Sequence, residues 1–422
     1  MDYSKEVAHI RQLVKSQDQW RKKECINLIA SENSPSPLVE EVYMSDFAHR
    51  YAEGDPGRRY YNGTKYIDEV ETLAMDLGNR LFGSRHCNVQ PVSGTGANLA
   101  ALAMFCQLGD TIISNSTANG GHITHNKAGA AGMLGITSID FPTTEDGFHI
   151  DADKAAKLTE RLSKNVRNHL SLMIFGCSLY LFPQPVKELA PTAHANGLHV
   201  MYDMAHVCGL VAGKQFQDPL KEGADIVCTS THKTFPGPQG GALFSNLPDE
   251  DWARRKPCIF PGTLSNYHLH RFPAFAMAAL EMLEFGEAYA KQTVSNAQLL
   301  ASELHALGFD VVCEEFGFTK SHQVVINVSQ QGGGKAVGDL LEANNIIVNK
   351  NLLPGEKLSM ANLDNPSGIR VGVQEMTRYG MKENEVKELA AIFKKAILDK
   401  KDAKRDAMEL RSRLQACQYT FK

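Results

Sequence analysis

The 422-residue sequence lacks the features of a membrane protein, a disulfide-stabilised secreted protein and a general nucleic-acid-binding protein. No apolar stretch approaches the roughly 18 residues of a membrane span, and the N-terminus shows no apolar core of a signal peptide. The nine cysteines are odd in number and include no CxxC pair, which is typical of reduced thiols. The net charge of −4 provides no basic surface for a phosphate backbone. We therefore expect a cytoplasmic protein that binds neither membranes nor nucleic acid.

A metal centre and a cysteine nucleophile are not expected either. His268 and His270 form a His-x-His pair, but the sequence offers no third ligand at a useful spacing. Cys177, Cys208 and Cys228 lie in or beside apolar runs, so we expect them to be small core residues. Any catalytic chemistry is therefore expected to come from other residue types.

From residue 88 onward, short apolar runs recur, most of them separated by segments long enough to form helices. The runs cover residues 111–114, 170–175, 199–202, 226–229 and 242–244. Short, near-continuous apolar strands that alternate with helices are typical of a mainly parallel sheet buried on both faces. The sequence therefore predicts an α/β fold.

Three parts are predicted along the chain. Residues 1–25 form an N-terminal helical arm with one apolar face, residues 26–285 form the large domain, and residues 286–422 form a smaller α+β domain. The strands predicted in the smaller domain are 324–328, 346–349 and 369–373, and its helices are 288–307, one from about 383, and a charged one over 394–418.

Polar residues follow the apolar runs at the points where the predicted strands end. They are His122 after the first run, Ser178 after the second, Asp203 and His206 after the third, and His232 and Lys233 after the fourth. In open parallel sheets, ligands bind at the carboxyl ends of the strands, so these side chains predict one shared site. Lys233 ends a buried strand and is flanked by hydroxyls, which suits a partly desolvated, nucleophilic amine.

A small-residue turn, Ser93-Gly94-Thr95, opens an apolar helix over residues 97–107 and offers N–H groups and hydroxyls to an anion. This turn, the lysine, an aspartate and a histidine together satisfy the needs of pyridoxal phosphate. The cofactor needs a lysine for a Schiff base, an anion such as Asp203 beside its pyridine nitrogen, and a flat group such as His122 on its ring.

Several motifs resemble the serine hydroxymethyltransferase family. They lie at residues 28–33 (LIASEN), 51–54 (YAEG), 59–61 (RYY), 120–122, 203–206 (DMAH), 230–234 (STHKT) and 368–370. The resemblance runs from about residue 3 to 400, and residues 235–241 and 261–270 resemble the archaeal-type branch. It implies the pyridoxal-phosphate fold type I, which is aspartate-aminotransferase-like, with a mainly parallel central sheet in the large domain and a smaller α+β C-terminal domain.

For the cofactor, the resemblance implies that Lys233 forms the Schiff base, Asp203 pairs with the pyridine nitrogen, His206 hydrogen-bonds the phenolic oxygen and His122 stacks on the ring. Further cofactor contacts are expected from Ser93, Gly94, Thr95, Ser178 and, from a neighbouring subunit, Gly262. His232, next to the lysine, is also a predicted catalytic residue.

For the substrates, the resemblance implies that Arg370 binds the amino-acid carboxylate as a bidentate pair. Glu53 is implied as the acid–base group near the serine hydroxyl, with Tyr51 beside it, both from the adjacent subunit of a homodimer with shared active sites. The remaining substrate contacts implied are Ser31, Tyr61 and, for the pterin, Asn351.

The implied reaction moves the hydroxymethyl carbon of serine to a tetrahydropterin and leaves glycine. Val92, Asp55, Thr117 and the run 261–266 depart from the common bacterial pattern, so tetrahydrofolate and tetrahydromethanopterin both remain open as carriers. Two alternatives use the same fold. One is a pterin-independent aldolase or transaldolase acting on threonine-like β-hydroxy amino acids, which needs the same cofactor residues. The other is an inactive homologue that serves as a binding protein, against which the intact Lys233 argues.

Overall fold

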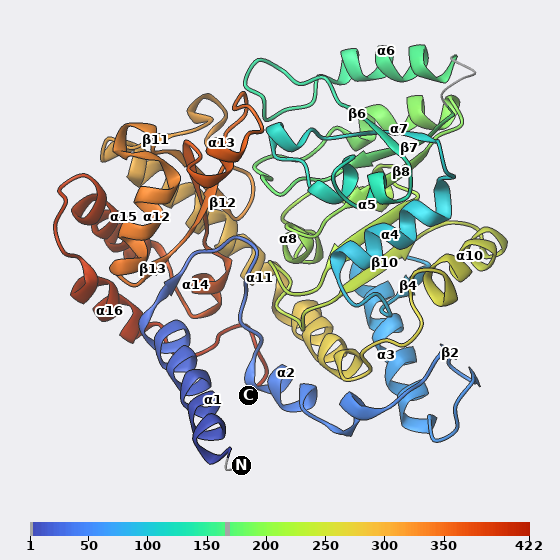
Figure 1. Cartoon of the computed structure of the whole chain (residues 1–422), viewed down its shortest axis with the longest axis horizontal. Helices are drawn as coiled ribbons and strands as arrows, with labels where there is room; N and C mark the ends of the chain where they lie inside the picture. The colour runs from blue at the N-terminus through green and yellow to red at the C-terminus, as the bar shows by residue number, and fades with distance from the viewer. Residues whose placement is uncertain (1–2, 165–168) are drawn as a thin grey trace. The chain divides into compact units, whose positions relative to one another are not determined.

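The computed structural model describes residues 3–164 and 169–422 (Figure 1). Its described residues divide into two compact units. The sheet unit comprises Ser31–Lys291 with Leu353–Lys357 and Tyr419–Lys422, and the terminal unit comprises the chain up to Ala30 with Gln292–Leu352 and Leu358–Gln418. The division differs from the predicted one because the N-terminal segment belongs with the C-terminal part of the chain and is not a separate arm.

The sheet unit is built on a seven-stranded sheet in the described chain, with the strand order β4-β10-β9-β8-β7-β5-β6. The strands are β4 His86–Asn88, β5 Thr111–Ser114, β6 Thr137–Asp140, β7 Leu170–Phe175, β8 His199–Asp203, β9 Ile226–Ser230 and β10 Gly241–Ser245. Strands β5 to β9 pair in parallel, and β10 pairs antiparallel with β9 and β4. The prediction of a mainly parallel sheet is confirmed, and every predicted apolar run is a strand.

The central strands β5, β7 and β9 are buried along their whole length, because helices cover the sheet on both faces. Helix α4 (Gly94–Phe105) packs on β9 and β10 with an almost entirely apolar surface. The other helices of this unit are α2 Pro37–Tyr43, α3 Lys65–Phe82, α5 Ala130–Met133, α6 Ala152–Ser163, α7 Val186–Ala195, α8 Cys208–Ala212, α9 Pro219–Glu222 and α10 Asp249–Arg255.

The terminal unit contains a four-stranded antiparallel sheet in the described chain, in the order β11-β12-β15-β14. Its strands are β11 Asp310–Val311, β12 Gln323–Asn327, β14 Asn349–Asn351 and β15 Gly368–Gly372. Its helices are α1 Ser4–Gln17, α12 Gly333–Ala343, α13 Met360–Asp364, α14 Gln374–Arg378, α15 Glu383–Ile397 and α16 Lys404–Arg413, and α11 Arg271–Ala306 begins in the sheet unit and ends here.

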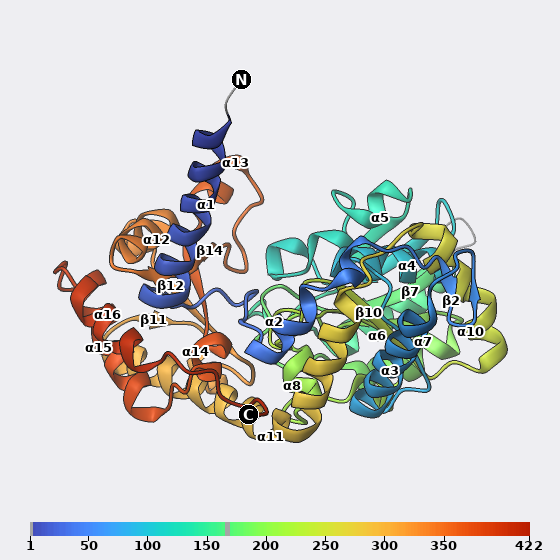
Figure 2. The ribbon, with the colours of Figure 1, turned by 90° about the horizontal axis from the view of Figure 1, so that it is seen from below.

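The N-terminal segment joins the terminal unit through one short strand pair. Strand β1 (Ile26–Asn27) pairs in parallel with β13 (Ile346–Ile347), and Ile26 is fully buried in the apolar core of this unit. Upstream, α1 projects from the unit with the N-terminus at its free end (Figures 1 and 2). None of the α1 residues, all of which are described, is buried.

Two helix predictions in this unit need correction. The predicted helix 288–307 is the second half of the much longer α11, and the charged helix predicted over 394–418 is two helices. Helix α15 ends at Ile397, and Lys400 adopts a left-handed conformation with φ of 52° before α16 begins. Among the described helices, none is long and apolar enough to cross a membrane.

Candidate active site

The carboxylate of Asp203, at the end of β8, lies at the centre of a buried polar cluster. Its Oδ2 accepts a hydrogen bond from Asn98 Nδ2 at 2.8 Å and lies 3.3 Å from His125 Nε2. Asn98 belongs to α4, and its Nδ2 also contacts Thr124 Oγ1 at 2.9 Å. All four side chains are buried, and the other carboxylate oxygen, Oδ1, accepts from the N–H of Ala205. The carboxylate is therefore held in one orientation.

This cluster keeps Asp203 ionised. Burial by itself would raise the pKa of the carboxyl, because a charge is poorly solvated in the interior. The hydrogen bond and charge of His125, the charge of His122 and the Asn98 hydrogen bond outweigh burial and hold the pKa of Asp203 well below its usual range. A buried aspartate that stays charged at neutral pH suits a protonated ring nitrogen as its partner.

His122 and Ser178 lie on two loops that are joined to each other. The N–H of Ser178 donates to the carbonyl of Gly120 at 2.7 Å, and Gly121 forms a bridge with Cys177. His122 precedes a short turn, where its Nδ1 lies 2.7 Å from Thr124 Oγ1, so the imidazole is tied to the Asp203 cluster through Thr124. The residues predicted after β5, β7 and β8 are thus brought together.

Lys233 follows β9 and is only 9% exposed. The next residue fixes this loop, because Thr234 Oγ1 donates to the carbonyl of His206 at 2.7 Å and accepts from the N–H of Gly209. His206 is itself buried, so the lysine loop is linked to the loop after β8. Burial, with the charges of Lys233 and Arg271, lowers the pKa of His232 to about 4, so this imidazole is neutral at physiological pH.

The Ser93-Gly94-Thr95 turn forms the N-terminus of α4, as predicted from its small residues. Ser93 caps the helix by accepting a hydrogen bond from the N–H of Gly96 at 3.0 Å. A side chain at Gly94 would place its Cβ 2.3 Å from Ser230 Oγ, so only glycine allows the turn to approach the end of β9 this closely. The anion-binding end of the helix and the lysine-bearing strand therefore meet.

Other predicted residues of the sheet unit lie on separate loops. Ser31 and His232 line one cavity of about 500 Å³. Tyr51, Glu53 and Tyr61 lie on the loop around the hairpin of β2 (Gly54–Asp55) and β3 (Arg58–Arg59), where the rings of Tyr51 and Tyr61 are 5.4 Å apart. Gly262 is exposed in the turn Ile259–Thr263.

Arg370 and Asn351 belong to the terminal unit. Arg370 lies on β15 and is 7% exposed, its Nε donates to Asn349 Oδ1 at 3.1 Å, and burial lowers its pKa to about 10. Asn351 ends β14, the neighbouring strand, which places both residues on the same sheet.

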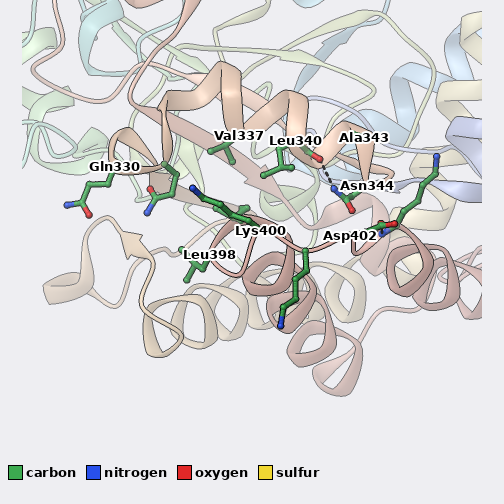
Figure 3. Close-up of a pocket in the computed structure, with 12 residues that line it drawn as sticks. Gln330, Val337, Leu340, Ala343, Asn344, Leu398, Lys400 and Asp402 are labelled. Carbon is green, nitrogen blue, oxygen red and sulfur yellow. Dashed lines mark hydrogen bonds between the residues drawn. The ribbon is translucent and has the colours of Figure 1, made fainter.

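A cavity of about 680 Å³ also lies in the terminal unit (Figure 3). Val337 and Leu340 of α12 face the segment that carries Leu398 and Lys400, and Asn344 Nδ2 donates to the carbonyl of Leu340. This cavity contains none of the predicted site residues. Within the described chain, no group of three or more histidine, cysteine, aspartate or glutamate side chains is arranged to hold a metal ion.

The comparisons with known proteins agree with this geometry. A family model described as serine hydroxymethyltransferase matches residues 3–393. The chain belongs to the serine hydroxymethyltransferase family. A serine hydroxymethyltransferase from Saccharolobus islandicus (strain M.14.25 / Kamchatka #1) is 50% identical over 100% of this chain and 96% of its own length. One from Metallosphaera sedula is 49% identical with the same coverage.

A solved structure points to the same fold. The crystal structure of an L-threonine transaldolase from Pseudomonas fluorescens matches with a TM-score of 0.87 and 30% identity, over 99% of this chain and 94% of that chain. As a member of the serine hydroxymethyltransferase family, the chain is a pyridoxal-phosphate-dependent enzyme of fold type I. The predicted resemblance to the archaeal-type branch is confirmed by the archaeal relatives.

The residues present fit pyridoxal phosphate. Asp203 would provide an ionised carboxylate for the ring nitrogen, and the turn at the N-terminus of α4, which lies against Ser230 at Gly94, would hold the phosphate. The buried Lys233 would supply the amine. These three elements meet at the carboxyl edge of one parallel sheet, where ligands bind in this class of fold.

Sequence reasoning missed three members of the Asp203 cluster, which are Asn98, Thr124 and His125. A signal was present for two of them, because Asn98 is the single amide in the apolar run of α4 and His125 lies three residues after His122. Arg271 was also missed. It is fully buried and donates to the carbonyls of Gln239 and Pro91, which fixes the loop after Lys233.

Proposed function

We propose that Lys233, Asp203 and His122 carry the serine–glycine interconversion of this hydroxymethyltransferase, in a site at the carboxyl edge of the sheet unit. The observation that supports this proposal most directly is the buried, ionised Asp203, held by Asn98 and His125. When bound, pyridoxal phosphate supplies an aldehyde for amines and a ring that withdraws electrons from the bond being broken. We further propose that the sheet unit and the terminal unit serve as the cofactor-binding domain and the smaller domain.

Each side chain then has a defined task. Asp203 would hold a proton on the pyridine nitrogen, Lys233 Nζ would provide the amine for the aldehyde, and the His122 imidazole would support the ring. His206 would hydrogen-bond the phenolic oxygen. The remaining cofactor contacts come from Ser93, Gly94, Thr95, Ser178 and the Gly262 of a second copy.

The amino acid and the pterin are bound by other residues. Arg370 pairs with the substrate carboxylate through its guanidinium, whose planar donors match two carboxylate oxygens. Glu53 moves the proton of the serine hydroxyl while the hydroxymethyl carbon leaves for the pterin. Ser31, Tyr51, Tyr61 and Asn351 complete the substrate contacts, and His232 stays neutral beside the lysine.

The enzyme works as a cytoplasmic homodimer in which each site uses residues from both copies. The apolar face of α1 supports this proposal, because Val7, Ile10 and Leu13 are each more than half exposed in the single chain. On the Glu53 loop, Tyr51 and Tyr60 are also more than half exposed. Two such surfaces are expected to be covered by a second copy of the chain.

Borohydride treatment of the holoenzyme tests the cofactor site. Borohydride reduces the carbon–nitrogen double bond between a lysine and the cofactor aldehyde, so the cofactor should become covalently attached to the peptide that contains Lys233. Peptide mass spectrometry would locate the attachment. Attachment at another lysine would contradict the proposal.

Mixing two inactive variants tests the shared site. Lys233→Ala and Glu53→Gln chains, refolded together in equal amounts, should recover about a quarter of the wild-type activity, because half of the dimers are hybrids with one intact site. No recovery in verified hybrids would show that Glu53 acts within its own copy.

A transaldolase-like activity is the second candidate, favoured by the structural similarity to the threonine transaldolase. The two functions can be distinguished by whether cleavage of the amino acid depends on a pterin acceptor. Serine cleavage that depends on tetrahydrofolate or tetrahydromethanopterin supports the hydroxymethyltransferase, and comparing the two pterins identifies the carrier. Cleavage of threonine with no response to either pterin would favour the second candidate.

A further inference from the structure

The main-chain carbonyls on both sides of Glu53 accept hydrogen bonds from two side chains, Arg59 and Tyr267. Arg59 Nη1 donates to the carbonyls of Ala52 and Gly54 at 2.7 and 2.5 Å, and the hydroxyl of Tyr267 donates to the same two carbonyls at 2.6 and 2.9 Å. The Arg59 side chain is 2% exposed and forms an ion pair with Glu71, which is fully buried. The backbone of Glu53 is therefore fixed by buried, charge-assisted hydrogen bonds.

The side chain of Glu53 has its own contact. Ser265 Oγ donates to Glu53 Oε1 at 2.8 Å. Ser265 lies two residues before Tyr267, so one short segment holds the carboxylate through Ser265 and the flanking carbonyls through Tyr267. The carboxylate would otherwise rotate freely, because Glu53 is partly exposed and its backbone contacts do not restrain the side chain.

The same segment continues from the turn that carries Gly262. The chain around the hairpin and the chain around this turn touch at two further points. Lys256 Nζ, three residues before the turn, lies 2.5 Å from Asp55 Oδ1, and the rings of Tyr60 and Phe260 are 6.1 Å apart. Tyr60 and Phe260 also line one cavity of about 510 Å³. The Glu53 loop and the Gly262 turn are thus parts of one substructure.

We infer that Ser265 is a positioning residue for Glu53. It orients the carboxylate that moves the proton of the serine hydroxyl, and it ties that carboxylate to the turn that reaches the cofactor phosphate of a second copy. This inference rests on the proposed role of Glu53. The contact that carries this role is the hydrogen bond from Ser265 Oγ to Glu53 Oε1, so the effect of Ser265 passes through the orientation of Glu53.

Removing the Ser265 hydroxyl should therefore lower the pterin-dependent rate and spare cofactor binding. A hydrogen bond to a charged group changes a rate by roughly tenfold when it is partly exposed. Ser265→Ala should reduce kcat for pterin-dependent serine cleavage by about that factor, with little change in the KM for serine. Ser265→Thr, which keeps a hydroxyl at the same position, should restore most of the rate.

The experiment is a double-mutant cycle on the holoenzyme, with Ser265→Ala, Glu53→Gln and the double variant. The kcat of pterin-dependent serine cleavage and the absorbance of the bound cofactor are measured for each. Thr263→Val is the matched control, because Thr263 lies two residues before Ser265 but its Oγ1 donates to the carbonyls of Cys258 and Ile259. Thr263→Val should change kcat by the same factor in the wild-type enzyme and in the Glu53→Gln enzyme.

The inference is supported if Ser265→Ala has no further effect in the Glu53→Gln enzyme and leaves the cofactor absorbance unchanged. The inference would be overturned if the effects of the two substitutions on kcat were additive. It would also be overturned if Ser265→Ala kept the full rate while Glu53→Gln was impaired. Either result would leave the proposed function intact. A fully active Glu53→Gln enzyme would show that the Glu53 carboxylate is not required, and it would overturn the inference as well.

Discussion

The strand-end cluster of the sheet unit and the cavity of the terminal unit in Figure 3 differ in almost every physical respect. The cluster is small and buried, and Asp203, Asn98 and His125 point at one another from three different segments. The cavity is the larger space, but its rim consists of exposed side chains such as Lys400 and Lys401. We propose that convergent, buried polar groups identify the site of the chemistry in this protein and that cavity volume does not. Five substitutions test this conclusion.

Lys233→Ala should have the largest effect. Loss of the amine that bonds to the cofactor aldehyde should lower serine cleavage by roughly a thousandfold or more. The fold should persist, since the change also removes a buried charge whose desolvation is unfavourable. Activity assays with a reduced pterin, alongside circular dichroism, measure the two effects, and retained full activity would refute the assignment.

Asp203→Asn should have the second-largest effect on activity. The amide has nearly the same shape but cannot keep a proton on the pyridine nitrogen, so kcat should fall by about a hundredfold. Asn98→Ala is the graded comparison, because it removes one of the hydrogen bonds to the carboxylate and should cost about tenfold. If Asn98→Ala were as damaging as Asp203→Asn, the charge of Asp203 would not be the deciding feature.

The pH dependence of stability offers a third test of the cluster region. Folding lowers the pKa of His232 from 6.5 to about 4, so the unfolded chain binds a proton first as the pH falls. This residue therefore leaves stability unaffected above pH 6.5 and reduces it between pH 6.5 and about 4, by roughly 3 kcal/mol at most. His232→Gln should flatten that decline in urea unfolding, and an unchanged decline would contradict the buried, neutral imidazole.

The smallest effect is expected in the terminal-unit cavity. Lys400→Gly removes a rim side chain at a left-handed position that glycine adopts easily. It should leave kcat unchanged and alter the free energy of unfolding by less than about 1 kcal/mol. A clear fall in kcat would indicate that this cavity has a role in the reaction, and it would contradict the contrast drawn between the cavity and the Asp203 cluster.

Most of the sheet could be predicted from the sequence, and many candidate site residues could be proposed from it, because their signals are local. The apolar run 226–229 and the Lys233 that follows it lie within a short stretch of sequence. Parallel strands end on the same edge of the sheet, so the residues that follow them are expected to lie together. The role of Asn98 could not be predicted, because its partner Asp203 lies 105 residues away. The division of the charged C-terminal helix was missed because a lysine, and not a glycine, occupies the left-handed position at residue 400.

The sequence also gave no sign of the contact between Ser265 and Glu53. The two residues are 212 positions apart, and neither lies in an element whose periodicity would indicate a partner. Arg59 belongs to a motif that could be recognised, but its task, holding the carbonyls beside Glu53, depends on Tyr267, which is 208 residues away. Contacts between loops of this kind depend on the whole fold.

The pairing of β1 with β13 has a consequence for how the chain is made. Trp20 Nε1 donates to Asn345 Oδ1 across 325 residues of sequence. At synthesis rates of roughly 5–20 residues per second, the N-terminal segment leaves the ribosome about 16 to 65 s before its partner does. The main stretch of the sheet unit, Ser31–Lys291, is continuous and can fold during that interval. The segment that emerges first is therefore among the last to reach its final position.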